Sequence, residues 1–234
     1  MRLWGGGKKF PIFRTIHIVW VGDENQRPNK FIETWRRQNP NWTVRVWGND
    51  ALTSLNWINH KHISQMLARR ELPGVADMLR WEILEKHGGF AIDADSVCIR
   101  SLEDWLFEPS VFACWENEIA RPGLIANGFV YAHPGNPLIQ QVIDDIHDLP
   151  NMDEGQPWTL TGPKRLTDTF RSMPYRDLTI YPSHYFLPSH YTGHSYSGSG
   201  PVFANQFWSN TRKKIREERE ARNAQKNRST DQSD

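Results

Sequence analysis

The sequence predicts an α/β fold, because segments with the period of a strand alternate with segments with the period of a helix along most of the chain. The strand candidates are short, rich in β-branched and aromatic residues, and bounded by Gly, Pro, Asn or Asp. The helix candidates between them are longer and end at Gly or Pro signals. The 234 residues are enough for one substantial core, so we expect a single domain.

The first strand, helix and second strand are predicted near the N-terminus. Residues 15–21 (Thr-Ile-His-Ile-Val-Trp-Val) are apolar and are followed by Gly22-Asp23, which indicates a buried strand that ends in a polar loop. Residues 29–38 have a helical pattern that Asn39-Pro40 stops, and residues 42–47 alternate as a second strand. This order predicts a parallel crossover.

A strong helix and a third strand are predicted in the middle of the chain. Pro73-Gly74 opens the helix, which runs over 75–87 and is closed by Gly88-Gly89. Residues 90–95 follow as a short apolar strand that ends in carboxylates, and we expect it to continue through 96–100. The other expected elements are a weak helix at 50–70, strands at 111–115, 128–132 and 178–181, and helices at 137–147 and 163–170.

The ends of the chain differ in composition from this central part. We expect a lead at 1–10, a folded domain at 11–210, and a charged tail at 211–234 that begins as a surface helix and runs into disorder. A basic tail could touch anionic lipid, so peripheral membrane contact is one role for it. Its charges are mixed, however, and plain solubility is the alternative.

Bulk composition excludes several classes of partner. Charged residues make up 24% of the chain and the net charge is +1, so we expect no nucleic-acid partner. No stretch approaches the roughly 20 apolar residues that span a bilayer. The two cysteines fit no zinc pattern and are too few to staple a secreted domain. We therefore expect a cytoplasmic protein without a transmembrane segment, with the inner face of a membrane as a place where it could act.

A pair of carboxylates ends the strand predicted at 90–95. Asp93 and Asp95 stand at positions i and i+2, so on a strand their side chains would project from the same face. Buried carboxylates repel each other and lose hydration, and a hard cation relieves both costs by binding their oxygens. The pair predicts a Mn²⁺ or Mg²⁺ site that diphosphate oxygens complete. The alternative is that both side chains cap a turn after the strand.

A second charged pair lies on the helix predicted at 75–87. Asp77 and Arg80 stand at i and i+3, beside the apolar Trp81 and Leu84. Because buried charges need partners, one interpretation is a salt bridge within the helix. The other is functional: Asp77 accepts hydrogen bonds from sugar hydroxyls, and the guanidinium group of Arg80 binds sugar or diphosphate oxygens.

The order of these motifs resembles that of a known family. Residues 11–20, the segment from Trp35 to Pro40, Ala76-Asp77-x-x-Arg80 with Gly88-Gly89, and Asp93-Ala94-Asp95 follow one another as in the Asp-x-Asp sugar-transferase family. That family includes yeast α-mannosyltransferases, bacterial capsular and lipopolysaccharide glycosyltransferases and, more distantly, the glucosylating clostridial toxins. The resemblance implies a GT-A fold with a Rossmann-like mixed sheet, a nucleotide-sugar donor, a divalent metal, usually Mn²⁺, and retention of anomeric configuration.

The resemblance also implies roles for individual residues. Trp20, at the end of the first strand, corresponds to the residue that stacks on the nucleobase, with an ordinary core tryptophan as the alternative. Asp77 and Arg80 correspond to the sugar contacts. Asp93 corresponds to the contact with the ribose and a metal-bound water, and Asp95 to the direct metal ligand.

The resemblance is looser in the C-terminal half. The segment around Asn127 resembles the part that lines the sugar and acceptor pocket, although a structural role is the alternative. Relatives often close the site with a His and a Trp near the C-terminus. Here His190 or His194 is the candidate for a third metal ligand and Trp208 for a lid over the diphosphate, at a spacing that departs from the pattern.

The sequence therefore predicts a metal-dependent retaining glycosyltransferase. It would move a hexose from a UDP- or GDP-linked donor to a hydroxyl acceptor, with a glycan or glycolipid as the acceptor class. Two other functions stay open at this point. One is a non-catalytic protein that binds a nucleotide-sugar or carbohydrate. The other is a metal-dependent phosphohydrolase, although such enzymes normally carry their carboxylates after the first strand.

Overall fold

The computed structural model describes residues 11–54, 56–174, 177–209, 211–213, 215–217 and 219–220. Its strands form a six-stranded mixed sheet of order β2-β1-β3-β6-β5-β7 and a two-stranded sheet of β4 and β8. The strands are β1 (Thr15–Val19), β2 (Thr43–Trp47), β3 (Gly89–Ile92), β4 (Ser96–Cys98), β5 (Val111–Asn117), β6 (Arg121–Ala132), β7 (Thr179–Tyr181) and β8 (Ala204–Gln206).

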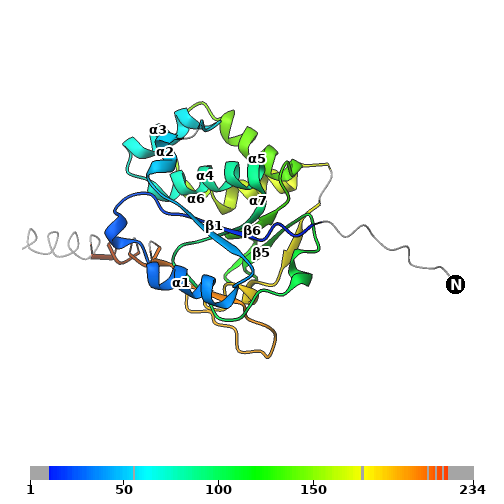
Figure 1. Cartoon of the computed structure of the whole chain (residues 1–234). Coiled ribbons are helices and arrows are strands. Elements are labelled where there is room, and N and C mark those ends of the chain that lie inside the picture. The colour runs from blue at the N-terminus through cyan, green and yellow to red at the C-terminus, as the bar shows by residue number, and fades with distance from the viewer. Residues whose placement is uncertain are drawn as a thin grey trace, which may run out of the picture.

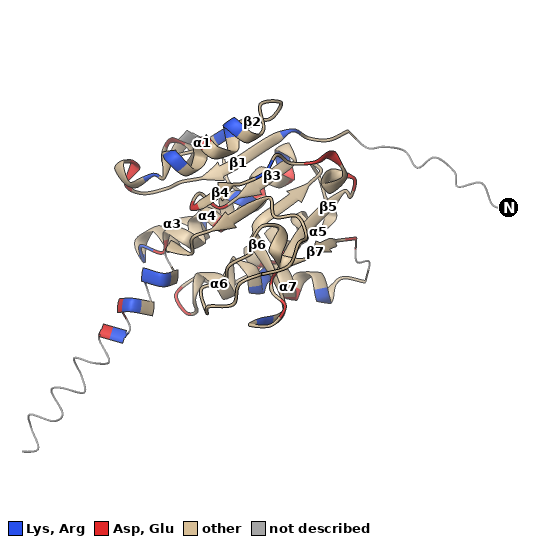
Figure 2. Ribbon diagram, turned by 90° about the horizontal axis from the view of Figure 1, so that it is seen from below, with Lys and Arg blue, Asp and Glu red and all other residues tan. Residues whose placement is uncertain are grey.

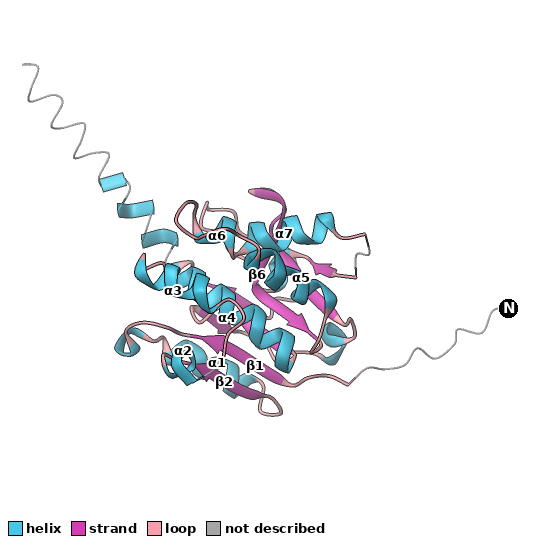
Figure 3. Ribbon diagram, turned by 90° about the horizontal axis from the view of Figure 1, so that it is seen from above, coloured by secondary structure: helices cyan, strands magenta, loops and turns pink. Residues whose placement is uncertain are grey.

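Helices cover both faces of the large sheet. They are α1 (Asn29–Gln38), α2 (Asp50–Ser54), α3 (His60–Ala68), α4 (Leu72–His87), α5 (Pro137–His147), α6 (Pro157–Leu160) and α7 (Pro163–Ser172), with short 3-10 turns η1 (Glu24–Gln26), η2 (Asp104–Phe107) and η3 (Ser183–Tyr185). Helices α2 to α7 gather on one face and α1 lies on the other (Figures 1 and 3). The predicted α/β class, mixed sheet and single domain are confirmed.

The order of the strands brings the ends of β1 and β3 together. Strand β1 pairs in parallel with β2 on one side and β3 on the other, so Ile18 lies level with Val46 and with Ile92. The carboxyl ends of these three strands therefore meet at one edge of the sheet. In open α/β sheets ligands bind outside this edge, where connections leave to opposite faces. Trp20, after β1, and Asp93, after β3, both lie there.

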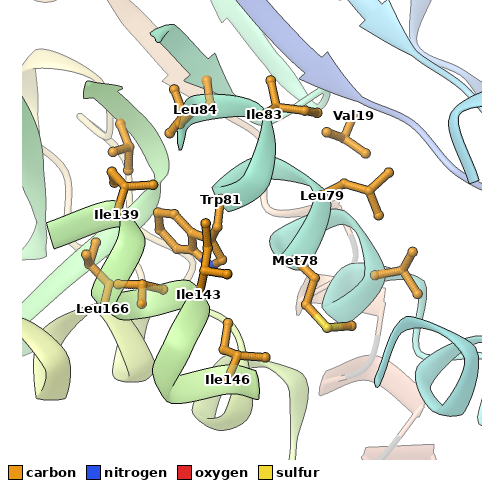
Figure 4. Packing of buried hydrophobic residues seen from close by; sticks show 14 of the residues in the cluster. Val19, Met78, Leu79, Trp81, Ile83, Leu84, Ile139, Ile143, Ile146 and Leu166 are labelled. Atoms are coloured by element: carbon orange, nitrogen blue, oxygen red, sulfur yellow. The ribbon is translucent and has the colours of Figure 1, made fainter. Parts of the chain in front are cut away.

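Two hydrophobic clusters sandwich the sheet because strand side chains alternate between its faces. On β3, Ala91 joins the cluster under the helices, whereas Phe90 and Ile92 join an aromatic cluster on the α1 side. Helix α4 buries most of its length in the first cluster, where Trp81 packs beside residues of α5 such as Ile143 (Figure 4). This burial fixes α4 along β3 and so fixes the polar residues that it carries.

The turn from α4 into β3 requires glycine. Gly88 and Gly89 have φ of +61° and +101°, in the region that favours glycine. A Cβ on Gly89 would lie 2.6 Å from the carbonyl oxygen of Thr15, so only glycine lets β3 approach β1 there. The Gly88 carbonyl also lies 2.9 Å from Nε2 of the buried His17.

The structure corrects several predicted elements. The weak helix expected at 50–70 is two helices, α2 and α3. Residues 96–100 do not continue β3, because the chain turns and β4 pairs with β8, a strand that the sequence did not suggest. Strand β6 begins seven positions earlier than expected, at Arg121 rather than Gly128, because it pairs with β5 along a hairpin.

The ends of the chain are described only in part. The lead expected at 1–10 and the end of the tail, 221–234, fall outside the described residues. The described residues from Ser209 to Glu220 are helical, and acidic and basic residues are interspersed along them (Figure 2). Within the described part of the chain, no helix is long and apolar enough to cross a membrane.

Candidate active site

Asp93 and Asp95 lie in a turn after β3, so the expectation that they project from one face of a strand is wrong. The Asp93 N–H still donates to the carbonyl of Gly128 on β6, at 2.9 Å. The hydroxyl of Ser96 then donates to the Asp93 carbonyl at 2.6 Å and closes the turn toward β4. The two carboxylates consequently have different partners.

The Asp93 carboxylate is held by two side chains from distant elements. Nη2 of Arg80 donates to Oδ1, and Nε2 of Gln206, the last residue of β8, donates to Oδ2 at 2.8 Å. A Cβ on Gly128 would lie 2.7 Å from Asp93 Oδ2, so the carboxylate lies against bare backbone. Asp93 therefore has a fixed orientation at the edge of the sheet.

Arg80 connects this carboxylate to Asp77. The residue is only 4% exposed, and its Nη1 donates to the carbonyl of Asn127 at 2.7 Å and to Asp77 Oδ1 at 3.3 Å. The planar guanidinium fork supplies several donors in fixed directions, which suits it to join two carboxylates and a carbonyl. The intrahelical salt bridge considered from the sequence thus exists, but as part of a larger network.

Asp77 is largely buried, with its side chain 13% exposed, and three groups donate to its carboxylate. Besides Arg80, Nδ2 of Asn127 donates to Oδ1 at 2.7 Å and the Thr161 hydroxyl donates to Oδ2 at 3.2 Å. Burial raises the pKa of Asp77 to about 7, although Arg80 and the two neutral donors act in the opposite direction. The group therefore titrates near neutral pH, which is common at functional sites.

Asp95 faces the chain after β8. Its Oδ2 accepts the backbone N–H of Ser209 at 2.7 Å, and its carbonyl accepts the N–H of Phe207 at 3.0 Å. Because helical residues begin at Ser209, the carboxylate lies at the positive end of a helix. Burial and then the charge of Asp93 nevertheless raise the pKa of Asp95. A carboxylate in this position would be relieved by a nearby cation.

Trp20 lies at the same edge of the sheet, after β1. Its ring belongs to neither hydrophobic cluster and is half-buried, so it is not the ordinary core tryptophan considered from the sequence. Its indole N–H donates to the carbonyl of Asp23 at 3.0 Å, which fixes the ring at the start of the loop. The ring is therefore available to stack on a planar ligand.

His190 and Trp208 pack together beside the carboxylates. His190 is 1% exposed, and its ring nitrogens lie 2.7 Å from the Thr192 hydroxyl and 3.3 Å from Glu116 Oε1. The Trp208 indole N–H donates to the Ser189 carbonyl at 2.8 Å, and the residue has φ of +58°, a costly conformation for a bulky residue. In this structure the side chains of His190 and Trp208 are therefore both engaged in contacts with other residues of the protein.

His194 lies apart from this buried pair. It is exposed, and its carbonyl accepts the N–H of His190 at 2.8 Å. Among the described residues, no cluster of three or more His, Cys, Asp or Glu side chains is arranged to bind a metal ion. A histidine as third metal ligand therefore stays a prediction.

Comparison with known proteins shows that part of this chain is similar to a described family. Residues 25–112 match the family described as glycosyltransferase sugar-binding region containing DXD motif. The single Asp-x-Asp in that range is Asp93-Ala94-Asp95. This segment is therefore similar to the DXD glycosyltransferase family. The match confirms the resemblance to a sugar-transferase family that the sequence predicts.

Three similar proteins are known by name. One is "Subversion of eukaryotic traffic protein A" of Legionella pneumophila, 24% identical over 60% of this chain and 26% of that protein. The second is an uncharacterized glycosyltransferase of Acanthamoeba polyphaga mimivirus, 23% identical over 74% of this chain and 72% of that protein. The third is HOC1 of Saccharomyces cerevisiae, named as a glycosyltransferase, 26% identical over 59% and 39%. The chain thus spans about a quarter of the Legionella protein.

Solved structures show the same fold. The PaToxG glycosyltransferase superposes with a TM-score of 0.59 at 17% identity, over 70% of this chain and 71% of that one. The UDP-bound glycosyltransferase domain from the YGT toxin superposes with a TM-score of 0.51 at 10% identity, over 71% and 79%. The expected GT-A fold of the DXD glycosyltransferase family is confirmed.

The residues of this DXD site fit a divalent cation. Mg²⁺ and similar hard cations are bound by one or two carboxylates together with phosphate oxygens of a substrate, which is the donor set that Asp93 and Asp95 can provide. Asn205, on β8, also has a buried side-chain oxygen without a hydrogen-bond partner among the described residues. Because side chains alternate along a strand, this oxygen lies on the opposite face of β8 from Gln206, which contacts Asp93, and Asn205 is not a candidate ligand.

Several partners of the site were missed from the sequence. Gln206 and Ser209 contact the two aspartates across more than a hundred residues of chain, which no local pattern reveals. Gly128 lies in the segment around Asn127 that the resemblance singled out, and a glycine before two apolar residues was the available signal for close backbone approach.

Proposed function

We propose that the protein is a metal-dependent retaining glycosyltransferase. It transfers a hexose from a UDP- or GDP-linked donor to a hydroxyl acceptor, for which a glycan is the class we favour. The observation that carries the proposal is the Arg80 guanidinium group joining Asp77 to Asp93 in the family's DXD segment. A network of this kind at the carboxyl edge of a sheet suits a polar ligand whose hydroxyl groups pair with the fixed carboxylates and guanidinium group.

Each residue of the site has a proposed contact with a different part of the donor. Asp95 is the proposed direct ligand of Mn²⁺ or Mg²⁺, and Asp93 the contact to ribose and a metal-bound water. When bound, the cation supplies positive charge to the departing nucleoside diphosphate. Asp77 and Arg80 orient the sugar, because their fixed donors and acceptors match hydroxyl groups. Trp20 stacks on the nucleobase from the end of β1.

The remaining assignments complete the site. Asn127, between Asp77 and the Arg80 guanidinium, keeps the sugar contacts in place. Trp208 is proposed to cover the diphosphate, and His190 or His194 to approach the metal, once the segment around them rearranges on donor binding. Retention of anomeric configuration is carried over from the family.

Thermal stability against nucleotides tests the proposal. We expect UDP or GDP with Mn²⁺ to raise the melting temperature of the full chain, and EDTA to abolish the rise. A ligand at 100 times its dissociation constant adds about 2.7 kcal/mol. The variant Asp95→Asn should lose the response, whereas Asp153→Asn, an exposed loop position, should keep it. A melting temperature indifferent to every nucleotide would refute donor binding.

A measurement of turnover distinguishes an enzyme from a protein that only binds the nucleotide-sugar. Slow metal-dependent hydrolysis of the matching nucleotide-sugar is expected, because water can replace an acceptor. A nucleotide response without hydrolysis or transfer would favour the non-catalytic alternative. Release of inorganic phosphate from simple phosphate esters would favour the phosphohydrolase.

A further inference from the structure

An exposed tryptophan lies next to the carboxylate site and has no part in the proposed donor contacts. Trp158, on α6, is 42% exposed, although large aromatic residues elsewhere in the described chain are mostly buried. Exposed aromatic rings are favoured where a protein binds a ligand that has an apolar face. The surroundings of Trp158 indicate which ligand this is.

The backbone of Trp158 lies close to the Asp77 carboxylate. A Cβ on Gly162 would be 2.9 Å from Asp77 Oδ2 and 3.0 Å from Trp158 Cα. The Asp77 carboxylate and the Trp158 backbone therefore both lie against Gly162. The segment is fixed, because the Trp81 indole N–H donates to the Thr161 carbonyl at 2.8 Å. The backbone of Trp158 thus lies beside the Asp77 carboxylate, at the edge of the proposed site.

Arg121 and Tyr191 form, together with Trp158, a row of contacting residues that we call the border of the site. The Arg121 guanidinium carbon lies 5.0 Å from the centroid of the Trp158 ring, and Nη1 donates to the Tyr191 hydroxyl at 2.9 Å. The Tyr191 ring in turn packs against Trp208, 5.3 Å between centroids. Trp208 directly precedes Ser209, whose N–H binds Asp95. The border therefore reaches both halves of the carboxylate site.

The sheet places this border away from the nucleobase. Strands β1 and β6 lie on opposite sides of β3, and Trp20 follows β1, whereas Arg121 begins β6. Because Phe129 pairs with Ile92 at the end of β3, the residues of β6 before it run past the end of β3 and pair with β5. Trp20 and the Arg121 that contacts Trp158 thus belong to segments on opposite sides of β3.

We propose that Trp158, Arg121 and Tyr191 form an acceptor subsite that binds a pyranose ring. The proposal rests on the proposed glycosyl transfer and names the substrate class of its second half. The indole supplies a flat apolar surface for the C–H face of the sugar, and the guanidinium group and the phenol supply donors for its hydroxyls. The bound sugar presents a hydroxyl toward the sugar of the donor.

Saturation-transfer NMR on the full chain tests the subsite. The probes are methyl α-mannoside, methyl α-glucoside and methyl β-galactoside, each with Mn²⁺ and with UDP or GDP. At least one probe should receive saturation from the wild-type protein. Trp158→Ala should weaken its binding about five- to tenfold, as expected for one lost stacking ring. Trp158→Phe should retain most of it, and Arg121→Gln should weaken it severalfold.

Two controls make the result specific. Trp105→Ala removes a tryptophan of similar exposure, 38%, that packs on Tyr181 and Tyr185, and it should leave probe binding unchanged. The nucleotide-induced thermal shift should persist in Trp158→Ala, since the ring lies outside the donor contacts. Loss of that shift in Trp158→Ala would overturn the assignment to the acceptor.

The two proposals can fail separately. A nucleotide response in wild type without saturation of any probe would overturn the subsite and leave donor binding standing. Saturation that Trp158→Ala does not reduce would also overturn it. Probe binding in a protein that responds to no nucleotide would overturn both the proposed transfer and the acceptor assignment.

Discussion

Arg80 donates a hydrogen bond to Asp93 from a helix that lies under the sheet, and its other terminal nitrogen serves Asp77 and the Asn127 carbonyl. One buried cation thus holds two carboxylates that come from different elements. Removing the cation would leave the Asp77 carboxylate and the half-buried Asp93 carboxylate without their main electrostatic partner. The arrangement therefore couples the stability of the fold to the geometry of the site.

We predict that Arg80→Ala lowers the free energy of unfolding by about 3–5 kcal/mol, the cost of leaving a buried charge unpaired. Asp93→Asn should offset part of this loss, so that the double variant is more stable than the sum of the single effects. Urea denaturation measures all three. Arg36→Ala breaks an exposed pair with Glu33 and should cost at most about 1 kcal/mol. If the losses of unfolding free energy in the two single variants simply added up in the double variant, this would contradict a network shared by Arg80 and Asp93.

We predict an unusual pH dependence from Asp77. Because burial raises its pKa to about 7, the folded state holds a proton that the unfolded state loses near its ordinary value of 3.8. The stabilising contribution is therefore full at low pH and is lost as pH rises from about 4 to 7. Its size is on the order of 4 kcal/mol. Denaturation of wild type and Asp77→Asn across this range measures the difference, which should shrink with rising pH.

The sequence predicted the helices of this fold better than its site. Helices α1 and α5 have the predicted bounds because capping and breaking signals are local. The site depends instead on where β3 stops. That end is set by a hydrogen bond from Ser96 and by pairing of β4 with β8 far along the chain, and neither leaves a periodic signal.

The polar residues of the site illustrate the same limit. Asp77 and Arg80 could be singled out because they interrupt an apolar helix, and their mutual contact follows from helical spacing. Gln206 could not, since its contact with Asp93 spans 113 positions. The sequence also has 11 tryptophans, and composition does not separate their roles: Trp35 and Trp81 are core residues, whereas Trp158 is exposed.

We predict that Gly128→Ala selectively damages metal binding. The backbone at Gly128 tolerates other residues, but the new methyl group would lie 2.7 Å from Asp93 Oδ2 and push the carboxylate away from Gln206. The Mn²⁺-dependent part of the nucleotide thermal shift should fall to a small fraction. Gly74→Ala, where the neighbour is the flexible side chain of Met66, is the matched control. A full Mn²⁺ response in Gly128→Ala would argue against Asp93 in the site.

We predict that neither cysteine reacts quickly with thiol reagents in the native protein. Burial raises the pKa of Cys98 to about 11 and raises that of Cys114 as well, so the reactive thiolate is scarce at neutral pH. Absorbance with a disulfide reagent at pH 7.5 should show slow release limited by opening of the fold, and both thiols should react at once in urea. A fast stoichiometric phase without denaturant would contradict this.

The last prediction concerns His17, which ties three strands together. The Trp47 indole can only donate, and its N–H lies 3.1 Å from His17 Nδ1, so Nδ1 is the acceptor and Nε2–H donates to the Gly88 carbonyl. Burial lowers the pKa of His17 to about 4. The neutral ring is therefore stabilising above the unfolded value of 6.5, and this contribution, on the order of 3 kcal/mol, is lost as pH falls toward 4.

NMR of the imidazole protons should show His17 titrating near pH 4 as the Nε2–H tautomer, and the variant His17→Gln should lose the pH dependence of unfolding between pH 6.5 and 4. Because Asp77 contributes with the opposite sign over much of this range, the stability of the wild-type protein alone would hide both effects. Each variant must therefore be compared with wild type at every pH. Titration of His17 near 6.5 would mean that the ring is hydrated and does not join β1 to the Gly88 turn.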